Sequence, residues 1–516
     1  MKALLTHRDR DFDPQQGLPW NESVLTQDLE LNTLLQTMAA GDKFLFDVAR
    51  AAVLSGFQND VDTVLYRQEV VKDCLSNPEL ARRLYDLTVE ATDNTKRMWW
   101  DLSSHYPESV LFGAVSLLDL LLDMLRKLRK IAEDADGRVH SEAFTTLMAM
   151  LKSELGDEYL ATIEQYLTEL KFRDGTLLSA SLGENNEGTN YMLSKPPKRE
   201  SSWLKRVLAK APPGYTFRLD PRDENGARIV SGIRHRGISR VAITLAQSAD
   251  HVVSFFKMLR TELAFYIGCL NLHYKLAAKG EPVCFPVPAE TSERKHRFSG
   301  LYDVCLTLHM EGRLVGNAAD ADGKSLTIVT GANQGGKSSF LRSIGLAQMM
   351  MQCGMFVGAE SFQAELCPAL FTQYKREEDA TMKSGKLDEE LARMSAIADH
   401  ITPNSMLLLN ESFAATNERE GSEIATQIVR ALLEKRVKIL FVTHLYDFAR
   451  GFYDNNDEAA FFLRAERKDD GTRTFKLLEG EPLETSYGKD LYRQIFGEAR
   501  EFQVRESIDR SSVSAD

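Results

Sequence analysis

The chain has 516 residues and a formal net charge of −12, with 43% hydrophobic and 27% charged residues. This length predicts two or three domains, and the apolar content is sufficient to bury a core in each of them. No apolar run approaches the roughly 18 residues of a membrane span, and charge interrupts the amino terminus before a signal-peptide core could form. The six cysteines are scattered without the close pairs that bind zinc. We therefore expect a cytoplasmic protein with reduced cysteines that does not enter a membrane.

Residues 26–177 carry apolar side chains three and four positions apart, which predicts one helix after another. The segment 109–134 is strongly apolar in its first half, but Asp119 and Asp123 interrupt it. This pattern indicates a packed core helix. A second helical stretch is expected over 248–279, so the first half of the chain is predicted to be all-α.

A basic stretch lies between these helical regions. Residues 195–240 contain twelve Lys or Arg and four Asp or Glu, a local charge of +8 in a chain that is negative overall. Such a stretch could bind nucleic-acid phosphates, or it could be a solvated face that pairs with the acidic remainder of the protein. The candidates for phosphate contact are Lys198, Arg199, Arg234, Arg236 and Arg240.

After Pro288 the sequence changes to short apolar runs that alternate with helical periods. The runs are SLTIVT at 325–330, MLLLNE at 406–411 and KILFVT at 438–443. Uninterrupted apolar strands separated by helices predict a parallel sheet that is covered on both faces. The carboxyl-terminal part is therefore expected to be an α/β domain.

A glycine-rich loop follows the first of these strands and has the spacing of a phosphate-binding loop (Walker A). Glycines allow a tight turn with inward-facing N–H groups, and the helix that follows adds its positive end. The lysine can reach the β and γ phosphates, and the adjacent serine can bind Mg²⁺. An empty glycine turn is the alternative, but the strand before the loop and the amphipathic helix after it favour a nucleotide site. The residues assigned to nucleotide binding are Gly331, Ala332, Asn333, Gln334, Gly335, Gly336, Lys337, Ser338 and Ser339.

The ends of the other two strands supply the remaining candidates. Glu411 is placed to orient the attacking water, and Asn410 stands where an aspartate would be expected to hold the metal. Asn410 offers an oxygen without the charge, so we expect weaker Mg²⁺ binding or slower hydrolysis. His444 could sense the γ-phosphate by hydrogen bonding. The predicted catalytic residues are Lys337, Glu411 and His444, and the metal ligands are Ser338, Asn410 and Glu411. A purely structural role for the Asn-Glu pair or for the histidine is the alternative.

With these residues assembled, the last 230 or so positions resemble the ATPase domain of the MutS family of DNA mismatch repair proteins. The helical region resembles the family's core and lever domains more weakly, at 64–87 and 248–279. The segments that carry the likeness in the ATPase part are TGANQGGKSSFLR at 330–342, QCGMFVGAESF at 352–362, NES at 410–412, FVTHLYDFA at 441–449 and TSYGKDLYRQIFG at 485–497.

The resemblance implies an ABC-type P-loop ATPase domain that uses ATP and Mg²⁺. It implies a helical core domain over 1–115, a lever over 116–285 with the basic insert in place of a clamp, and the ATPase domain over 286–516. It also implies that two copies dimerise around ATP, and Ser384 is our candidate for the contact made in trans. The implied partner is DNA in mismatched, branched or otherwise structured form, with structured RNA as an alternative.

Departures from the family pattern leave a second function open. The segment 377–391 matches the family at Ser384-Gly385 but has Leu387-Asp388 where a serine is expected. The amino-terminal domain with a Phe-x-Glu wedge and the carboxyl-terminal dimerisation tail are not expected in this chain. A nucleotide-switched assembly protein that binds a protein partner without nucleic acid is the alternative. An energising subunit of a transporter is disfavoured because an LSGGQ-type signature is missing.

Overall fold

A computed structural model describes residues 1–102, 106–173, 175–185, 187–194, 215–376, 385–468 and 470–483. The chain forms two compact units. Unit 1 contains Met1–Leu4, Glu79–His140 and Phe144–Leu263, and unit 2 contains Leu5–Pro78, Ser141–Ala143 and Ala264–Asp516. Among the helices of the described ranges, none is both long and apolar enough to cross a membrane.

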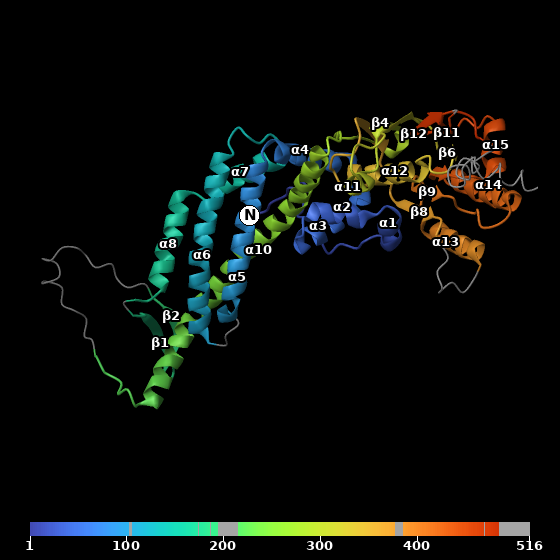
Figure 1. The fold of residues 1–516 in the computed structure, drawn as a ribbon. Coiled ribbons are helices and arrows are strands. Elements are labelled where there is room, and N and C mark those ends of the chain that lie inside the picture. Colours follow the sequence, from blue (N-terminus) through green and yellow to red (C-terminus); the bar gives the residue numbers. More distant parts are fainter. Residues whose placement is uncertain are drawn as a thin grey trace, which may run out of the picture. The chain divides into compact units, whose positions relative to one another are not determined.

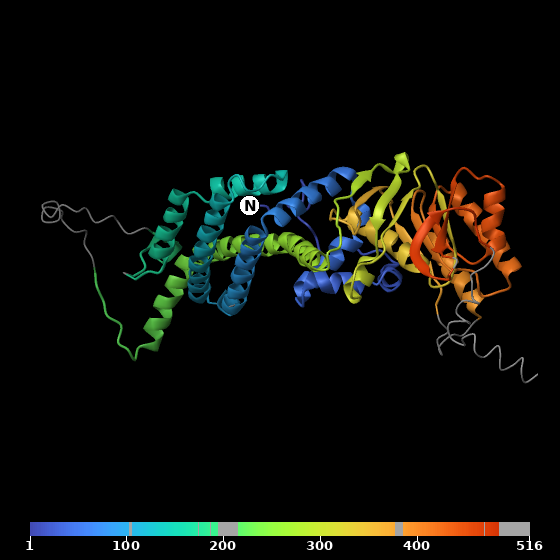
Figure 2. The same cartoon turned by 45° about the horizontal axis from the view of Figure 1, so that its top comes forward.

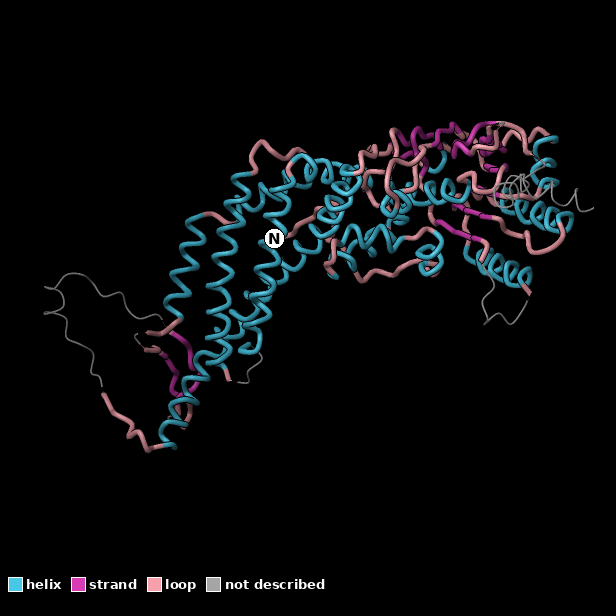
Figure 3. Tube along the Cα trace, in the orientation of Figure 1, coloured by secondary structure: helices cyan, strands magenta, loops and turns pink. Residues whose placement is uncertain are grey.

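Unit 1 is built almost entirely from helices (Figure 3). Its long helix α6 begins with Pro107 in the first turn. Proline is suited to this position because N–H groups of the first turn have no acceptor within the helix. Helix α6 buries an apolar stripe, and ion pairs such as Lys127 with Glu90, at 2.9 Å, lie along its other side. The helices are α5 (Pro78–Leu102), α6 (Pro107–Asp134), α7 (Glu142–Glu154), α8 (Asp157–Leu170) and the first part of α10 (Glu224–Ala278).

Helix α10 begins much earlier than the helix expected over 248–279. Figure 2 shows it as one continuous green ribbon that starts at Glu224. The Asp223 side chain accepts a hydrogen bond from the Gly226 N–H at 2.8 Å, which satisfies an open donor of the first turn. The arginines at 234, 236 and 240, which the sequence analysis assigned to the basic insert at about 195–240, therefore lie on this helix.

A small hairpin packs against this helix. Strands β1 (Leu178–Leu182) and β2 (Gly188–Leu193) pair antiparallel and were not predicted from the sequence. Leu178 approaches α10 so closely that a Cβ at Gly237 would lie 2.4 Å from its Cδ2. Glycine at that position lets the hairpin lie directly on the helix.

Unit 2 contains the parallel sheet (Figure 1). Its strand order is β12-β11-β6-β10-β9-β8, and all neighbours are parallel except β12, which runs antiparallel to β11. The three strands predicted from apolar runs are present as β6, β9 and β10. The bounds are β6 (Leu326–Gly331), β8 (Leu370–Tyr374), β9 (Met406–Asn410), β10 (Lys438–Val442), β11 (Ala460–Arg467) and β12 (Arg473–Glu479).

Alternating side chains of these strands pack on opposite faces, as expected for a sheet that is buried on both sides. Leu407 and Leu409 belong to a core cluster with residues of α13 (Lys386–His400), α14 (Glu418–Glu434) and α15 (Tyr446–Asp454). Leu408 faces the other way, toward Gly345 of α12 (Lys337–Gln352). Helix α12 therefore covers the face opposite to α13–α15.

A second sheet of four strands, in the order β3-β7-β4-β5, was not predicted. A buried ion pair of 2.9 Å between Lys438 of β10 and Glu365 of β7 joins it to the larger sheet. The strands are β3 (Val287–Ala289), β4 (His296–Leu301), β5 (Asn317–Asp320) and β7 (Ser361–Glu365), and the short helix α11 (Val304–His309) connects β4 to β5.

The first residues of unit 2 are also helical. They pack against the α/β part of the same unit through contacts of α1 with β8, α2 with α11 and α3 with α12. These helices are α1 (Glu22–Asp28), α2 (Leu31–Ala39), α3 (Lys43–Leu54) and α4 (Val61–Ser76).

Candidate functional site

The glycine-rich loop joins β6 to α12, as its sequence predicts. Gly331 and Gly336 have φ angles of 106° and 85°, in the left-handed region that side chains disfavour. Space is limited as well, since a Cβ at Gly331 would lie 2.9 Å from the backbone nitrogen of Ala465 in β11. The loop therefore turns sharply against β11 and leads into the first turn of α12, whose N-terminal amides lack helical acceptors.

Lys337, the first residue of α12, is buried and folds back over the loop. Its Nζ donates hydrogen bonds to the carbonyl oxygens of Gly331 and Ala332, each at 3.0 Å. Burial lowers the pKa of Lys337 to about 8, and the charge of Glu411 opposes that shift. The loop thus holds its ammonium group at the position where the sequence predicts phosphate contacts.

Ser338 and Asn410 meet although 72 residues separate them. The Ser338 hydroxyl donates a hydrogen bond of 3.0 Å to the Oδ1 atom of Asn410, the last residue of β9. Hydroxyl, amide and carboxylate oxygens are the hard ligands that Mg²⁺ accepts, and this ion usually takes few protein ligands when phosphates supply the rest. Over the described ranges there is no group of three His, Cys, Asp or Glu that could hold a metal by itself. The donor set therefore suits a magnesium ion that is held mainly by a phosphate-bearing ligand.

Glu411 and His444 form a hydrogen-bonded pair of 3.0 Å between Oε1 and Nε2. Glu411 has a φ of 54°, an uncommon backbone conformation for a residue with a side chain. The hydrogen bond from His444 lowers the pKa of Glu411, and the charges of His444, Lys375 and Lys337 add to that effect, while burial opposes it. Lys375 Nζ lies 3.8 Å from the other carboxylate oxygen, Oε2. Glu411 is therefore held as a carboxylate.

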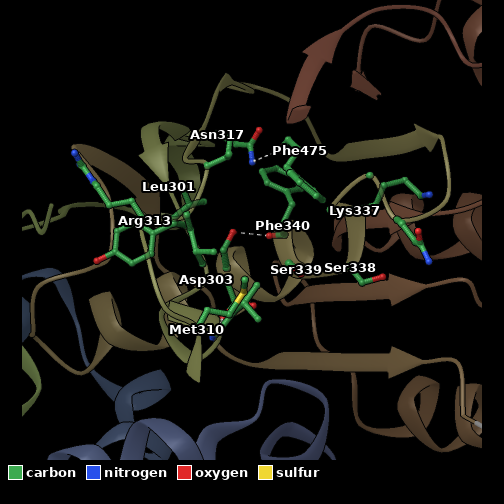
Figure 4. Close-up of a pocket in the computed structure, with 18 of the residues that line it drawn as sticks. Leu301, Asp303, Met310, Arg313, Asn317, Lys337, Ser338, Ser339, Phe340 and Phe475 are labelled. Carbon is green, nitrogen blue, oxygen red and sulfur yellow. Dashed lines mark hydrogen bonds between the residues drawn. The ribbon is translucent and has the colours of Figure 1, made fainter. Parts of the chain in front are cut away.

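A cavity of about 500 Å³ lies beside the loop. In Figure 4, Lys337 and Ser338 stand on one side of it, and Asp303 and Met310 stand on the other. Its polar wall comes from residues 333–339 and Glu411. The opposite wall is largely apolar and includes Leu301, Leu306, Met310, Leu314 and Val315. Phe475 also lines the cavity and lies against Gly336 of the loop, where a Cβ would be 3.5 Å from its Cδ1.

The sequence did not point to this opposite wall. Phe475 was missed as well, and Asn317 positions it, because its side chain donates to the Phe475 carbonyl at 3.3 Å and accepts from the Leu477 N–H at 2.8 Å. Arg473 donates from Nε to the Asn333 carbonyl at 3.1 Å and so braces the loop itself. These residues come from β5 and β12, which are far apart in the chain and share no recognisable spacing.

The nucleic-acid candidates are placed unevenly. Lys198 and Arg199 lie outside the described residues, as do Ser384 and the segment 485–497. Arg234 Nε lies 3.2 Å from Glu108 Oε1, and the Arg236 guanidinium lies 5.1 Å from the centre of the Tyr191 ring. Arg240 is exposed on α10. Two of the three described arginines thus have partners within unit 1.

Two family models match the chain. The MutS2 N-terminal domain matches residues 59–279, and MutS domain V matches residues 327–496. Together they cover the helices from α4 to α10 and the parallel sheet with its glycine-rich loop. MutS domain V is a P-loop ATPase domain.

Known proteins show the same likeness. The chain is 23% identical to human MutS protein homolog 4 over 372 residues, which is 69% of this chain and 37% of that protein. It is 29% identical over 174 residues to the DNA mismatch repair protein MutS of Petrotoga mobilis, covering 34% of this chain and 21% of that protein. For MutS of Thermus aquaticus the identity is 34% over 122 residues, covering 24% of this chain and 15% of that protein.

These matches define the class as a protein that joins a helical region to a MutS-type ATPase domain. The chain belongs to the MutS family, which confirms the resemblance inferred from its motifs. Members of this family are ATPases. The chain spans 37% of the human relative and a smaller share of the two bacterial proteins.

The lowered pKa of Lys337 can be tested by amine labelling of the nucleotide-free protein at a series of pH values. Because the neutral amine is the reactive form, a pKa of about 8 brings labelling to half its maximum near pH 8. In a peptide that contains this lysine the ordinary pKa of about 10.4 applies. Mass spectrometry measures both profiles, and coincident profiles for the folded protein and the peptide would contradict the prediction.

Proposed function

We propose that this chain is an ATPase with an ABC-type P-loop domain that binds ATP with Mg²⁺ and hydrolyses it. One observation carries the proposal. The glycine-rich loop, the Ser338–Asn410 pair and the Glu411–His444 pair all lie at the carboxyl ends of neighbouring parallel strands. Ligand sites of parallel α/β sheets lie at this edge.

The loop and Lys337 bind the phosphates in this proposal. Backbone N–H groups at the start of α12 donate to the phosphates, and the Lys337 ammonium exchanges the carbonyls of Gly331 and Ala332 for the β and γ phosphate oxygens. Ser338 and Asn410 hold the magnesium ion, which neutralises charge on the phosphates when bound. The apolar wall around Met310 and Phe475 receives the nucleotide base.

Glu411 orients the attacking water. His444 occupies Oε1, so Oε2 remains to accept a hydrogen bond from water. The water oxygen forms the new bond to the γ phosphorus while a water proton passes to Glu411 Oε2. The bond from that phosphorus to the β–γ bridging oxygen breaks, and ADP leaves with that oxygen. His444 has two roles in this proposal. It orients Glu411 through their hydrogen bond, and it senses the γ-phosphate by hydrogen bonding.

Two substitutions separate binding from chemistry. Lys337→Ala removes the cation that contacts the phosphates and should weaken ATP binding by about ten-fold or more. Glu411→Gln keeps the size of the side chain but cannot accept a proton, so ATP should still bind while turnover falls by about 10²-fold or more. Fluorescent-nucleotide titration and phosphate release measure the two effects. Unchanged turnover in both variants would reject the ATPase proposal.

Asn410 offers the metal an uncharged oxygen. Restoring the carboxylate with Asn410→Asp should strengthen Mg²⁺ binding, because two unit charges about 4 Å apart interact by roughly 4 kcal/mol at an effective dielectric of 20 before solvent offsets are counted. A titration of ATPase activity against Mg²⁺ should therefore reach half-maximum at a lower concentration. Asn410→Ala serves as the matched control. If Asn410→Asp leaves the Mg²⁺ concentration for half-maximal activity unchanged, the amide of Asn410 does not weaken metal binding.

We propose that unit 1 binds DNA. ATP binding and hydrolysis are coupled to clamping of the protein on DNA and to its release. Membership of the MutS family, relatives named as DNA mismatch repair proteins and the local charge of +8 over 195–240 support this assignment. The substrate is mismatched, branched or otherwise structured DNA, and the process is mismatch repair or a related repair or recombination reaction. Dimerisation around ATP with Ser384 in trans, the domain division given above and a cytoplasmic location belong to the same proposal.

Salt dependence tests the DNA assignment. Arg236→Glu and Arg240→Glu should each weaken binding and reduce the slope of log K against log salt by about one, because each removes one phosphate contact. Lys435→Glu makes the same charge change at an exposed position in unit 2 and serves as the control. Equal loss in all three variants, or no binding to any duplex, branched or single-stranded DNA, would contradict the assignment.

A nucleotide-switched protein that binds a protein partner is the second candidate. The ion pair of Arg234 with Glu108 favours it, because a paired arginine is less available to phosphate. A partner that is retained by the purified chain after nuclease treatment, and released on ATP addition, would support this function over DNA binding.

A further inference from the structure

Three charged side chains form a network beside the cavity. The Arg342 Nε donates to Asp303 Oδ2 at 2.5 Å, and its Nη1 donates to Glu30 Oε1. The second oxygen of Asp303 accepts the N–H of Leu306 at 3.0 Å. The Asp303 side chain is 2% exposed and that of Arg342 is 14% exposed, so this arginine is largely withdrawn from water. One guanidinium therefore joins two carboxylates that lie far apart in the sequence.

Each member of the network comes from a different part of unit 2. Arg342 lies on α12, which begins at the phosphate-binding loop. Asp303 lines the cavity and caps α11, the helix that carries Leu306 in the wall opposite Lys337. Glu30 lies between α1 and α2 and has a left-handed φ of 54°. Arg342 thus links the amino-terminal segment to Asp303, which lines the nucleotide cavity.

Further contacts bind the same amino-terminal segment to the site. The Glu30 carbonyl accepts a hydrogen bond from Cys305 Sγ at 3.4 Å, and Thr33 Oγ1 lies 2.9 Å from His309 Nε2. Leu29 packs so closely on α12 that a Cβ at Gly345 would lie 2.8 Å from its Cδ2. Helix α2 therefore packs on α11, and the turn between α1 and α2 packs on α12. Neither family model covers them, because the matches begin at residues 59 and 327.

We propose that Glu22–Ala39 is an integral part of the nucleotide site and that Glu30 is a positioning residue, which sets nucleotide affinity through Arg342 and Asp303. The inference rests on the proposed nucleotide binding. Arginine suits this role because its planar fork can donate to two carboxylates in fixed directions. Asp303, Leu306 and Met310 form the wall opposite Lys337 and Glu411, so loosening the network should change binding more than the chemical step.

The test uses the full chain and a substitution that removes charge but keeps shape. Glu30→Gln should raise the Kd for ATP and for ADP by about five-fold, while kcat stays within about two-fold, since a half-exposed ion pair contributes little more than 1 kcal/mol. Asp47→Asn is the matched control, because it removes a carboxylate from an exposed pair with Lys43 on α3, the helix that follows this segment. Fluorescent-nucleotide titration with Mg²⁺, and again with a chelator, gives affinities that do not depend on turnover.

A double-mutant cycle tests whether Glu30 acts on nucleotide affinity through Arg342. Arg342→Lys keeps the charge but cannot bridge both carboxylates, so it should weaken binding alone and add little to Glu30→Gln. Thermal unfolding of each nucleotide-free variant confirms that the chain is folded. Additive effects, a fall in kcat at unchanged Kd, or equal affinities in the Glu30→Gln and Asp47→Asn variants would each overturn the inference.

The same titration separates this inference from the proposed function. If the wild-type chain binds no nucleotide, the proposed function fails and takes the inference with it. A different result rejects only the role of Glu30. In that case the wild type binds nucleotide and Lys337→Ala loses affinity, but Glu30→Gln does not.

Discussion

The parallel register of β6, β10 and β9 is the constraint on which the site depends. Val442 pairs with Val329 on one side and with Asn410 on the other, so the three strands end at one level of the sheet. The residues that follow them must therefore share a small volume. This is why Ser338, Asn410, Glu411 and His444 meet, although the chain makes two helical crossovers between them. A shift of register by one residue would turn every side chain of the shifted strand to the other face and disperse the group.

The charges at this edge are few and unequally buried. Lys337 is withdrawn from water, whereas Glu411 is 28% exposed and has His444 and Lys375 as neighbours. Asn410 adds an amide where a carboxylate would have brought a second anion. At the strand ends two lysines, Lys337 and Lys375, therefore stand near the one carboxylate of Glu411, a balance that favours an anionic ligand there before a metal is counted. Because Ser338 and Asn410 both offer uncharged oxygens, a magnesium ion bound by them would take most of its coordination from phosphate oxygens.

Local patterns predicted those features that are local in the chain. The loop at 331–338 and the strands around Ile328, Leu408 and Leu440 are defined by the spacing of glycines and by uninterrupted apolar residues, and each lies where it was expected. The order of strands and the β3-β7-β4-β5 sheet depend on pairing between distant segments, which no short window contains. For the same reason Phe475 and Asp303 were missed, since each reaches the cavity through contacts with residues more than 30 positions away. The start of α10 was placed too late because polar and basic residues, including Arg228 and Arg234, obscure its apolar stripe.

Helix α12 connects these observations. Its first turn carries Lys337 and Ser338, and its second turn carries Arg342. Its far end is held as well, because the Gln352 carbonyl accepts from Asn59 Nδ2 at 2.8 Å and the Cys353 carbonyl accepts from Arg67 Nη1 at 3.4 Å. A packed helix moves as a rigid body more easily than it bends, since its interior hydrogen bonds and close contacts resist local change. A displacement of the loop must then either be shared by the amino-terminal helices and α4 or break one of these contacts, so the helices outside the sheet are coupled to whatever occupies the loop.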